Sequence, residues 1–344
     1  MKVEAVMHVL WSDRQLAHSG TRFVQAGQIL ASPESPGRTE LILQTLAARG
    51  HSVSAPPDGG LAPILAAHDA DYVTFLQTAH ESWTAFAGTK ASVIPNVHPR
   101  GPAARRPTSP IGRLGWYTGD MACEITAGTW TASYASAQAA AGVARVVADR
   151  RDTAYALCRP PGHHAGHARA MGFCYLNNAA IAAEELRRTF DRVAILDVDV
   201  HHCNGTQDIF YKRSDVFVAS IHGDPDHYYP FYWGYTDQTG AGDGLGTNLN
   251  VPFPVGSGDQ PFLNALASAL DGIRRFAPQA IVLSLGVDAS IHDPHGRHTV
   301  SNDGFRRMAE RICALRTPTA IVQEGGYASA QLGGIVADIL EILA

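Results

Sequence analysis

The chain is poor in cysteine, which argues against two kinds of site. Its 344 residues include five cysteines, and no two of them are spaced as Cys-x-x-Cys. Disulfide frameworks usually need an even number of cysteines, and thiolate zinc sites usually need closely spaced pairs. We therefore expect neither from these residues, which are Cys123, Cys158, Cys174, Cys203 and Cys313.

Long hydrophobic runs and long basic runs are missing as well. No apolar stretch approaches the roughly 20 residues that a membrane-spanning helix needs. The opening residues MKVEAVMHVLWSDRQ lack the apolar core and cleavage site of a secretory signal. No run of Lys or Arg stands out, and the net charge is −5 with histidine neutral. These absences predict a soluble protein of the reducing cytoplasm with no membrane or nucleic-acid partner.

The chain does contain enough apolar sequence for a large core. Hydrophobic residues make up 45% of it, and its length allows one large α/β domain or two smaller ones. Short apolar runs alternate with helical patterns, which predicts a parallel sheet covered on both faces. The predicted strands are 152–157, 192–198, 216–221, 279–285 and 319–323. The predicted helices are 39–48, 71–86, 132–148, 179–190, 260–276, 303–315 and 332–343.

Residues 91–115 interrupt this regular alternation. The segment is rich in Pro, Arg and Gly, a composition that does not favour a regular helix. An insertion of this length is usually a lid, a rim or a subunit contact. A flexible surface loop is an equally good interpretation of the composition.

The stretch Ile195–Thr206, ILDVDVHHCNGT, carries the clearest chemical signal. After a short apolar strand, Asp197, Asp199 and His201 stand at alternate positions, and residues two apart in a strand point to the same side. Oxygen and nitrogen ligands without thiolate suit a catalytic zinc better than a structural one. A loop that merely begins with polar residues is the alternative.

Three further strand ends carry complementary side chains. His163 and His164 follow the strand 152–157, and adjacent histidines suit a base and its electrostatic partner better than two ligands of one metal. Asp288 follows the strand 279–285, where a third ligand would be expected. Tyr327 follows two glycines after the strand 319–323. In α/β folds the sites gather at the carboxyl ends of the strands, so together these residues indicate catalysis.

The motifs PPGHHA, MGFCYLNNAA, ILDVDVHHCNGTQDIFY, SLGVDA and QEGGY resemble those of the histone deacetylase superfamily. Within it, they are most similar to the bacterial acetylpolyamine amidohydrolases and class II-like deacetylases. The resemblance runs in order from about residue 115 to the end of the chain. It implies an arginase-like three-layer α/β/α sandwich with a mostly parallel eight-stranded sheet. We expect residues 1–344 to form this single deacetylase domain.

The resemblance also implies a role for each residue at the strand ends. His164 would be the general base and later the acid, and His163 would stabilise the transition state. Asp197 and Asn204 would orient these two imidazoles, while the hydroxyl of Tyr327 would polarise the amide carbonyl. The implied zinc ligands are Asp199, His201 and Asp288.

Two further groups follow from the resemblance. Phe173 and Tyr229 match the aromatic walls of a narrow substrate tunnel, with Gly172 beside them and His295 at the rim. The family's structural potassium site would be formed around Asp197, Asp199, His201, Ser220 and Ile221.

The chain departs from the family pattern at two places. Cys203 replaces the usual glycine of HHGNG, which would strain the backbone if a positive φ is needed there. In acetylpolyamine amidohydrolases the segment equivalent to 91–115 mediates dimerisation and places acidic residues over the tunnel mouth. Ile111 and Ala122 align with those acidic positions here, but Asp120 and Glu124 lie nearby and could substitute. A homodimer is therefore expected.

The sequence predicts a zinc-dependent amidohydrolase that removes acetyl groups from acetylated primary amines, such as acetylpolyamines or similar small amines. The first alternative is a deacetylase of acetyl-lysine in proteins. A more distant one is an arginase-like ureohydrolase, which would need a second metal and a DxHxD pattern where this chain has DVDVHH. A protein that binds without catalysis would be expected to lack His164 or Tyr327, and both are present.

Overall fold

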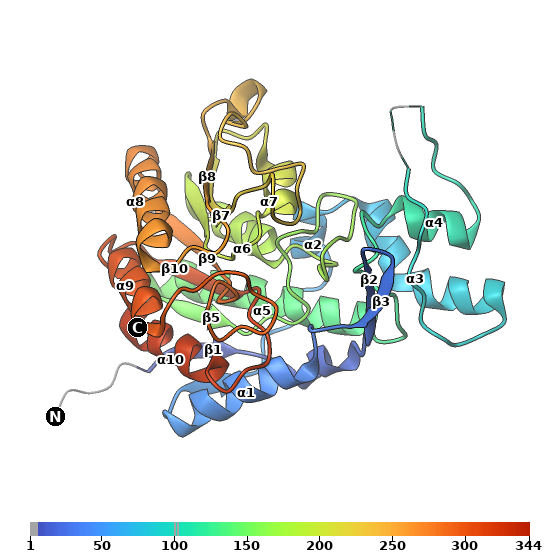
Figure 1. The fold of residues 1–344 in the computed structure, drawn as a ribbon, viewed down its shortest axis with the longest axis horizontal. Coiled ribbons are helices and arrows are strands. Elements are labelled where there is room, and N and C mark those ends of the chain that lie inside the picture. The colour runs from blue at the N-terminus through green and yellow to red at the C-terminus, as the bar shows by residue number, and fades with distance from the viewer. Residues whose placement is uncertain (1–5, 100, 102) are drawn as a thin grey trace.

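A parallel sheet of eight strands forms the centre of the molecule (Figure 1). The computed structural model describes residues 6–99, 101 and 103–344. Every pair of neighbouring strands in the sheet is parallel, so the predicted mostly parallel eight-stranded sheet is confirmed. Across the sheet, the strands are β4 (Ser52–Ser54), β1 (His8–Leu10), β5 (Ala154–Ala156), β10 (Thr319–Gln323), β9 (Ala280–Leu285), β6 (Val193–Asp197), β7 (Val216–Gly223) and β8 (Asn248–Phe253).

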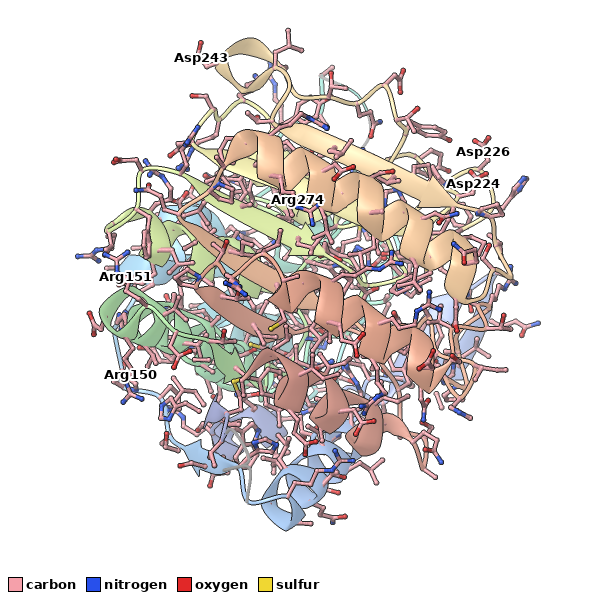
Figure 2. The ribbon with its side chains drawn as sticks, turned by 90° about the vertical axis from the view of Figure 1, so that its left-hand side faces the viewer. Arg150, Arg151, Asp224, Asp226, Asp243 and Arg274 are labelled. Atoms are coloured by element: carbon pink, nitrogen blue, oxygen red, sulfur yellow. The ribbon has the colours of Figure 1, made fainter. Side chains whose placement is uncertain are left out.

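Helices cover both faces of this sheet. Because alternate strand residues point to opposite faces, Val193 and Ile195 of β6 enter one core while Ala194 and Leu196 enter the other. The first core is closed by α2 (Ala62–Ala67), α3 (Ala70–Ala87), α4 (Pro110–Trp116), α5 (Thr129–Arg150), α6 (Asn178–Arg187) and α7 (Asn204–Phe210). The second is closed by α1 (Pro36–Ala48), α8 (Asp259–Phe276), α9 (Asn302–Cys313) and α10 (Leu332–Leu343). Figure 2 looks onto this second face, where α8, α9 and α10 run across the sheet.

The first turn of α6 is tied to the loop that carries the paired histidines. The side chain of Asn177 caps the helix by accepting a hydrogen bond from Ala180 N at 2.8 Å, as expected of asparagine at this position. Its Nδ2 also donates to the carbonyl oxygen of Ala165 at 2.9 Å. One side chain therefore starts the helix and holds the residue next to His164.

Several elements were not predicted from the sequence. The segment 91–115 was expected to be irregular, but it contains the start of α4. Pro110 does not prevent this helix, since it occupies the first helical turn, where proline is tolerated. Arg100 and Pro102 of that segment, and the first five residues of the chain, lie outside the described residues. The other unpredicted elements are β2 (Arg22–Gln25), β3 (Gln28–Ala31), β4, β8, α2, α7, and the short 3-10 helices η1 (Asp13–Ala17) and η2 (Gly242–Gly244).

In the part of the chain that the structure describes, no helix has both the length and the apolar character needed to cross a lipid bilayer.

Candidate active site

Two strand ends bring three possible metal ligands together. Asp199 and His201 follow β6, and Asp288 follows the neighbouring strand β9. Their ligand atoms all lie within 4.8 Å of one another. Nδ1 of His201 is 3.0 Å from a carboxylate oxygen of Asp199 and 3.0 Å from one of Asp288. The three side chains thus face a common point.

The surroundings of the two carboxylates fit a divalent cation. Backbone amides hold one oxygen of each, since Gly325 N donates to Asp199 Oδ2 at 2.7 Å and Val200 N donates to Asp288 Oδ1 at 3.1 Å. The other oxygen of Asp288 is buried and lies 3.0 Å from Nδ1 of His201. Burial and the Asp199 charge raise the pKa of Asp288. Two buried carboxylates at this separation are costly unless a positive charge compensates them.

The donor set also suits zinc. Two carboxylates and one imidazole are three protein ligands without thiolate, which is typical of catalytic zinc sites that keep a further position open. These are the three ligands predicted from the sequence. No second cluster of three metal-ligating side chains is found among the described residues.

The paired histidines have different hydrogen-bond partners. Their ring centroids are 4.1 Å apart. Nδ1 of His163 is 3.1 Å from Asp197 Oδ2, whereas Nδ1 of His164 is 2.7 Å from the amide oxygen of Asn204. The structure thus pairs each imidazole with the residue expected to orient it.

The different partners separate the pKa values of the two histidines. Burial lowers the pKa of His163, but the charges of Asp197 and Asp199 outweigh burial and raise it to about 10. Burial lowers the pKa of His164 well below its ordinary value, and the positive charge on His163 adds to this shift. These opposite shifts favour a neutral His164 beside a protonated His163, an arrangement that suits a base with an electrostatic partner.

Tyr327 is held at the edge of the same site. Its backbone N–H donates to Asp293 Oδ2 at 2.7 Å. The preceding Gly326 has φ +116°, a conformation that favours glycine, and its carbonyl accepts a hydrogen bond from Arg38 Nε at 2.6 Å. The ring of Tyr327 makes edge contacts with Phe173 and with His295. The two glycines of QEGGY therefore form the turn that presents the tyrosine.

Sequence reasoning missed the role of Glu324. Its fully buried carboxylate accepts hydrogen bonds from the backbone amides of Gly162, at 2.6 Å, and His163, at 3.1 Å. Burial raises its pKa to about 7. The signal was present in the QEGGY motif, where an acidic residue stands at the end of an otherwise apolar strand. Glu324 holds the turn from which both histidines project.

A cavity of about 580 Å³ leads to these groups. The aromatic residues Phe173 and Tyr229 line it, as do Gly172 and His295. Gly172 has φ +56°, and a Cβ at this position would collide with the ring of His164, so the wall passes close to the base only because the residue is glycine. The predicted catalytic and metal residues on the lining are His163, His164, Asp199, His201, Asp288 and Tyr327.

The two carboxylates proposed for the mouth are already engaged. Asp120 lines the cavity, but its carboxylate accepts hydrogen bonds from the Tyr229 hydroxyl at 2.5 Å, from Gly172 N at 3.2 Å and from Ala122 N at 3.0 Å. Glu124 is not among the described lining residues. Its buried carboxylate is directed instead to Thr21 and Arg22. Neither side chain is placed as an open acceptor for an ammonium group.

Cys203 does not strain the backbone. Its φ is −78° and its ψ is 58°, outside the left-handed region that favours glycine. The thiol is buried in the core between the sheet and α7. The backbone strain expected from replacing glycine here is therefore absent, because the turn does not need a positive φ.

The residues of the expected potassium site lie on adjacent strands. Asp197 of β6 is paired in register with Ser220 of β7, and Ile221 follows it. The Ser220 hydroxyl lies 2.8 Å from Nδ1 of His222. Asp199 and His201 follow the same end of β6, so the predicted group lies at the carboxyl end of β6 and on the neighbouring strand β7.

Comparison with known proteins agrees with this geometry. The profile of the histone deacetylase domain matches residues 32–343. The chain belongs to the histone deacetylase family. It is 46% identical over 318 residues to an acetylpolyamine amidohydrolase of Burkholderia pseudomallei, covering 92% of each chain. It is 43% identical over 338 residues to acetylpolyamine amidohydrolase 1 of Pseudomonas aeruginosa, covering 96% of this chain and 97% of that one.

Solved structures of this family have the same fold. The crystal structure of an acetylpolyamine aminohydrolase from Burkholderia pseudomallei superposes with a TM-score of 0.94 at 43% identity, covering 98% of both chains. The HDA15 HD domain superposes with a TM-score of 0.81 at 27% identity, covering 98% of this chain and 90% of the other. The predicted membership in an enzyme family of deacetylases and amidohydrolases is thus confirmed.

Proposed function

We propose that this histone deacetylase family member is a zinc-dependent amidohydrolase that removes acetyl groups from acetylated primary amines, with small amines such as acetylpolyamines as substrates. One observation supports the reaction most directly: three metal-ligating side chains, two histidines with different partners and a tyrosine line one cavity. The names of the relatives support the choice of acetylpolyamines.

The ligand set Asp199, His201 and Asp288 would hold the zinc ion. Zinc bound there would lower the pKa of the attacking water and polarise the amide carbonyl. When Nδ1–H of His164 donates to Asn204 Oδ1, the lone pair of Nε2 is left to take a proton from the attacking water. The same nitrogen then delivers that proton to the leaving amine.

The remaining residues stabilise the charge that develops on the substrate and hold the substrate in position. His163, paired with Asp197, places positive charge beside the reacting centre. The hydroxyl of Tyr327 donates to the carbonyl oxygen as negative charge develops there. Phe173 and Tyr229 enclose the extended methylene chain of the substrate.

The substrate assignment is tested by comparing kcat/KM for N-acetylputrescine and for an acetyl-lysine peptide. We expect the small amine to be the better substrate. An acetyl-lysine protein substrate remains the second candidate, because Asp120 and Glu124 are engaged with the protein itself and do not select for a polyamine. A strong preference for the peptide would refute the polyamine assignment and leave the deacetylase chemistry intact.

Replacing Tyr327 by phenylalanine should lower kcat by about 100-fold or more, because removing one donor to a developing oxyanion typically has an effect of this size. The ring contacts with Phe173 and His295 should survive, so KM and the thermal unfolding midpoint should change little. Steady-state kinetics and a melting curve provide the check. Wild-type turnover in this variant would contradict the proposed role.

Two further assignments belong to the same proposal. A structural potassium ion would be held around Asp197, Asp199, His201, Ser220 and Ile221, and potassium-dependent stability would support it. The segment 91–115 would mediate a homodimer. The molar mass measured by light scattering can test this. The cytoplasm remains the expected location.

A further inference from the structure

The β2–β3 hairpin forms part of the cavity wall without belonging to the central sheet. Its strands pair only with each other among the described strands, in antiparallel register from Arg22↔Ala31 to Gln25↔Gln28. Figure 1 shows it in blue, away from the strands of the sheet. The hairpin residues on the cavity lining are Phe23, Val24, Gln25 and Ala26. An isolated two-stranded hairpin is at best marginally stable in water, so this wall needs an anchor.

Glu124 is placed to be that anchor. Its Oε2 accepts hydrogen bonds from the backbone amides of Thr21, at 2.7 Å, and Arg22, at 3.0 Å, where the first strand begins. Its Oε1 accepts from Nε of Arg22 at 3.2 Å, from Nη2 of the same guanidinium at 3.1 Å, and from the Ser92 hydroxyl. The Glu124 side chain is 2% exposed. A single buried carboxylate therefore receives both backbone and side-chain donors from the base of the hairpin.

Two further contacts of the hairpin come from the same short segment and from the opposite wall. Val24 N donates to the carbonyl of Met121 at 3.1 Å. The rings of Phe23 and Phe173 meet edge to face, with centroids 5.5 Å apart. Residues 120–124 thus connect both sides of the cavity, since Asp120 in the same segment holds Tyr229 and Gly172.

We propose that Glu124 is a positioning residue that sets the substrate-binding width of the cavity by holding the β2–β3 hairpin against Phe173. The inference rests on the proposed function for its kinetic consequence. Without the carboxylate, the amides of Thr21 and Arg22 lose a charged acceptor in a partly buried position, and charge-assisted hydrogen bonds of this kind are stronger than neutral ones. The hairpin then loosens, and the wall formed by Phe23 and Val24 moves away from Phe173.

This role predicts an effect on substrate binding rather than on the chemical step. The Glu124 carboxylate is hydrogen-bonded to Thr21, Arg22 and Ser92, and none of its described hydrogen bonds reaches the catalytic or metal-ligating side chains. In Glu124→Ala we expect KM for N-acetylputrescine to rise at least tenfold while kcat stays within about threefold of wild type. KM equals the dissociation constant of the substrate only when the chemical step is slower than substrate dissociation, which single-turnover kinetics can establish.

Two matched variants distinguish loss of the backbone hydrogen bonds of Glu124 from loss of an ordinary ion pair. Arg22→Ala removes the guanidinium, which is 48% exposed, but keeps the backbone amides that Glu124 accepts from. Because exposed ion pairs contribute little, KM should stay within twofold. Glu185→Ala removes a comparable carboxylate paired with Arg145 on a different part of the fold and should also leave KM unchanged.

Amide hydrogen exchange of residues 21–31 measures the local stability of the hairpin and does not depend on enzyme activity. Exchange of these amides should be at least tenfold faster in Glu124→Ala and unchanged in Arg22→Ala. If Glu124→Ala does not fold, Glu124→Gln should show an intermediate increase in both KM and exchange, since it keeps one acceptor oxygen. Unchanged exchange, KM within twofold, or a loss confined to kcat would overturn the inference. If the wild type hydrolyses no acetylated amine, the proposed function fails, and the exchange experiment still decides whether Glu124 anchors the hairpin.

Discussion

Replacing His164 by alanine is expected to lower kcat by about 1,000-fold while the fold persists. General acid–base catalysis by a positioned side chain contributes typically 10²–10⁴-fold, and burial lowers the pKa of His164 well below its ordinary value. Its Nδ1 is held by Asn204 at 2.7 Å, so the other nitrogen is presented to the substrate. The measurement is steady-state turnover of N-acetylputrescine, with circular dichroism to monitor folding.

The same loop offers a matched control. His167 is exposed and makes no described side-chain hydrogen bond or ion pair, so His167→Ala should retain wild-type turnover. Equal activity in the His164 and His167 variants would show that the proton is moved by another group. A loss of folding in the His164 variant would show up in the dichroism spectrum and be distinguished from a loss of catalysis.

Replacing Asp288 by asparagine is expected to reduce both metal content and activity. Mutating a residue that hydrogen-bonds to a metal ligand usually lowers metal affinity by about 10- to 100-fold. Losing a direct ligand should lower metal affinity further. Asp288 supplies one of the three converging ligand atoms, and one of its buried oxygens lies 3.0 Å from Nδ1 of His201. We expect zinc to fall from one ion per chain to well below one after dialysis, and kcat/KM to fall at least 1,000-fold.

Asp271→Ala is the control for this experiment. Asp271 lies on the exposed side of α8, where it pairs with Arg274. Its removal changes the net charge as Asp288→Asn does but leaves the cavity untouched, so zinc content and activity should match wild type. Full zinc content in the Asp288 variant would refute its assignment as a ligand. Two manganese ions per wild-type chain would instead favour the ureohydrolase alternative.

The side chains of the site could be named from the sequence because each follows a short apolar strand. Asp199, His201, Asp288 and Tyr327 all occur just past such strands, and the parallel sheet predicted from the alternation puts strand ends on one edge. Glu324 could have been found by the same reasoning, since it stands in the QEGGY motif. Its partners, the amides of Gly162 and His163, are far away in the chain and left no local signal.

The order of the strands could not be predicted in this way. The four strands that deliver the site are consecutive neighbours in the sheet, in the order β5, β10, β9 and β6, although they are far from consecutive in sequence. Neighbouring parallel strands lie about 4.8 Å apart, so this order brings the histidine pair, the tyrosine and the three ligands within reach of one substrate. Strand order depends on how helices cover the two faces, which no local pattern records.

The roles of the acidic residues near the mouth were also decided by tertiary contacts. Sequence proximity to the aligned positions suggested that Asp120 and Glu124 would receive an ammonium group. The structure directs Asp120 to Tyr229 and Glu124 to Thr21 and Arg22, more than 100 residues away along the chain.

The sequence alone was therefore enough to predict the parts of the candidate site: its metal-ligating residue types, its paired histidines, its tyrosine and the parallel sheet that carries them. These follow from side-chain identity and from the periodicity of strands and helices, which are local properties. Only the tertiary structure decided which strand ends meet, which carboxylates accept internal hydrogen bonds, and that a hairpin hydrogen-bonded to Glu124 lines the cavity. Those outcomes depend on contacts between distant segments, whose free energies are set by packing rather than by local sequence.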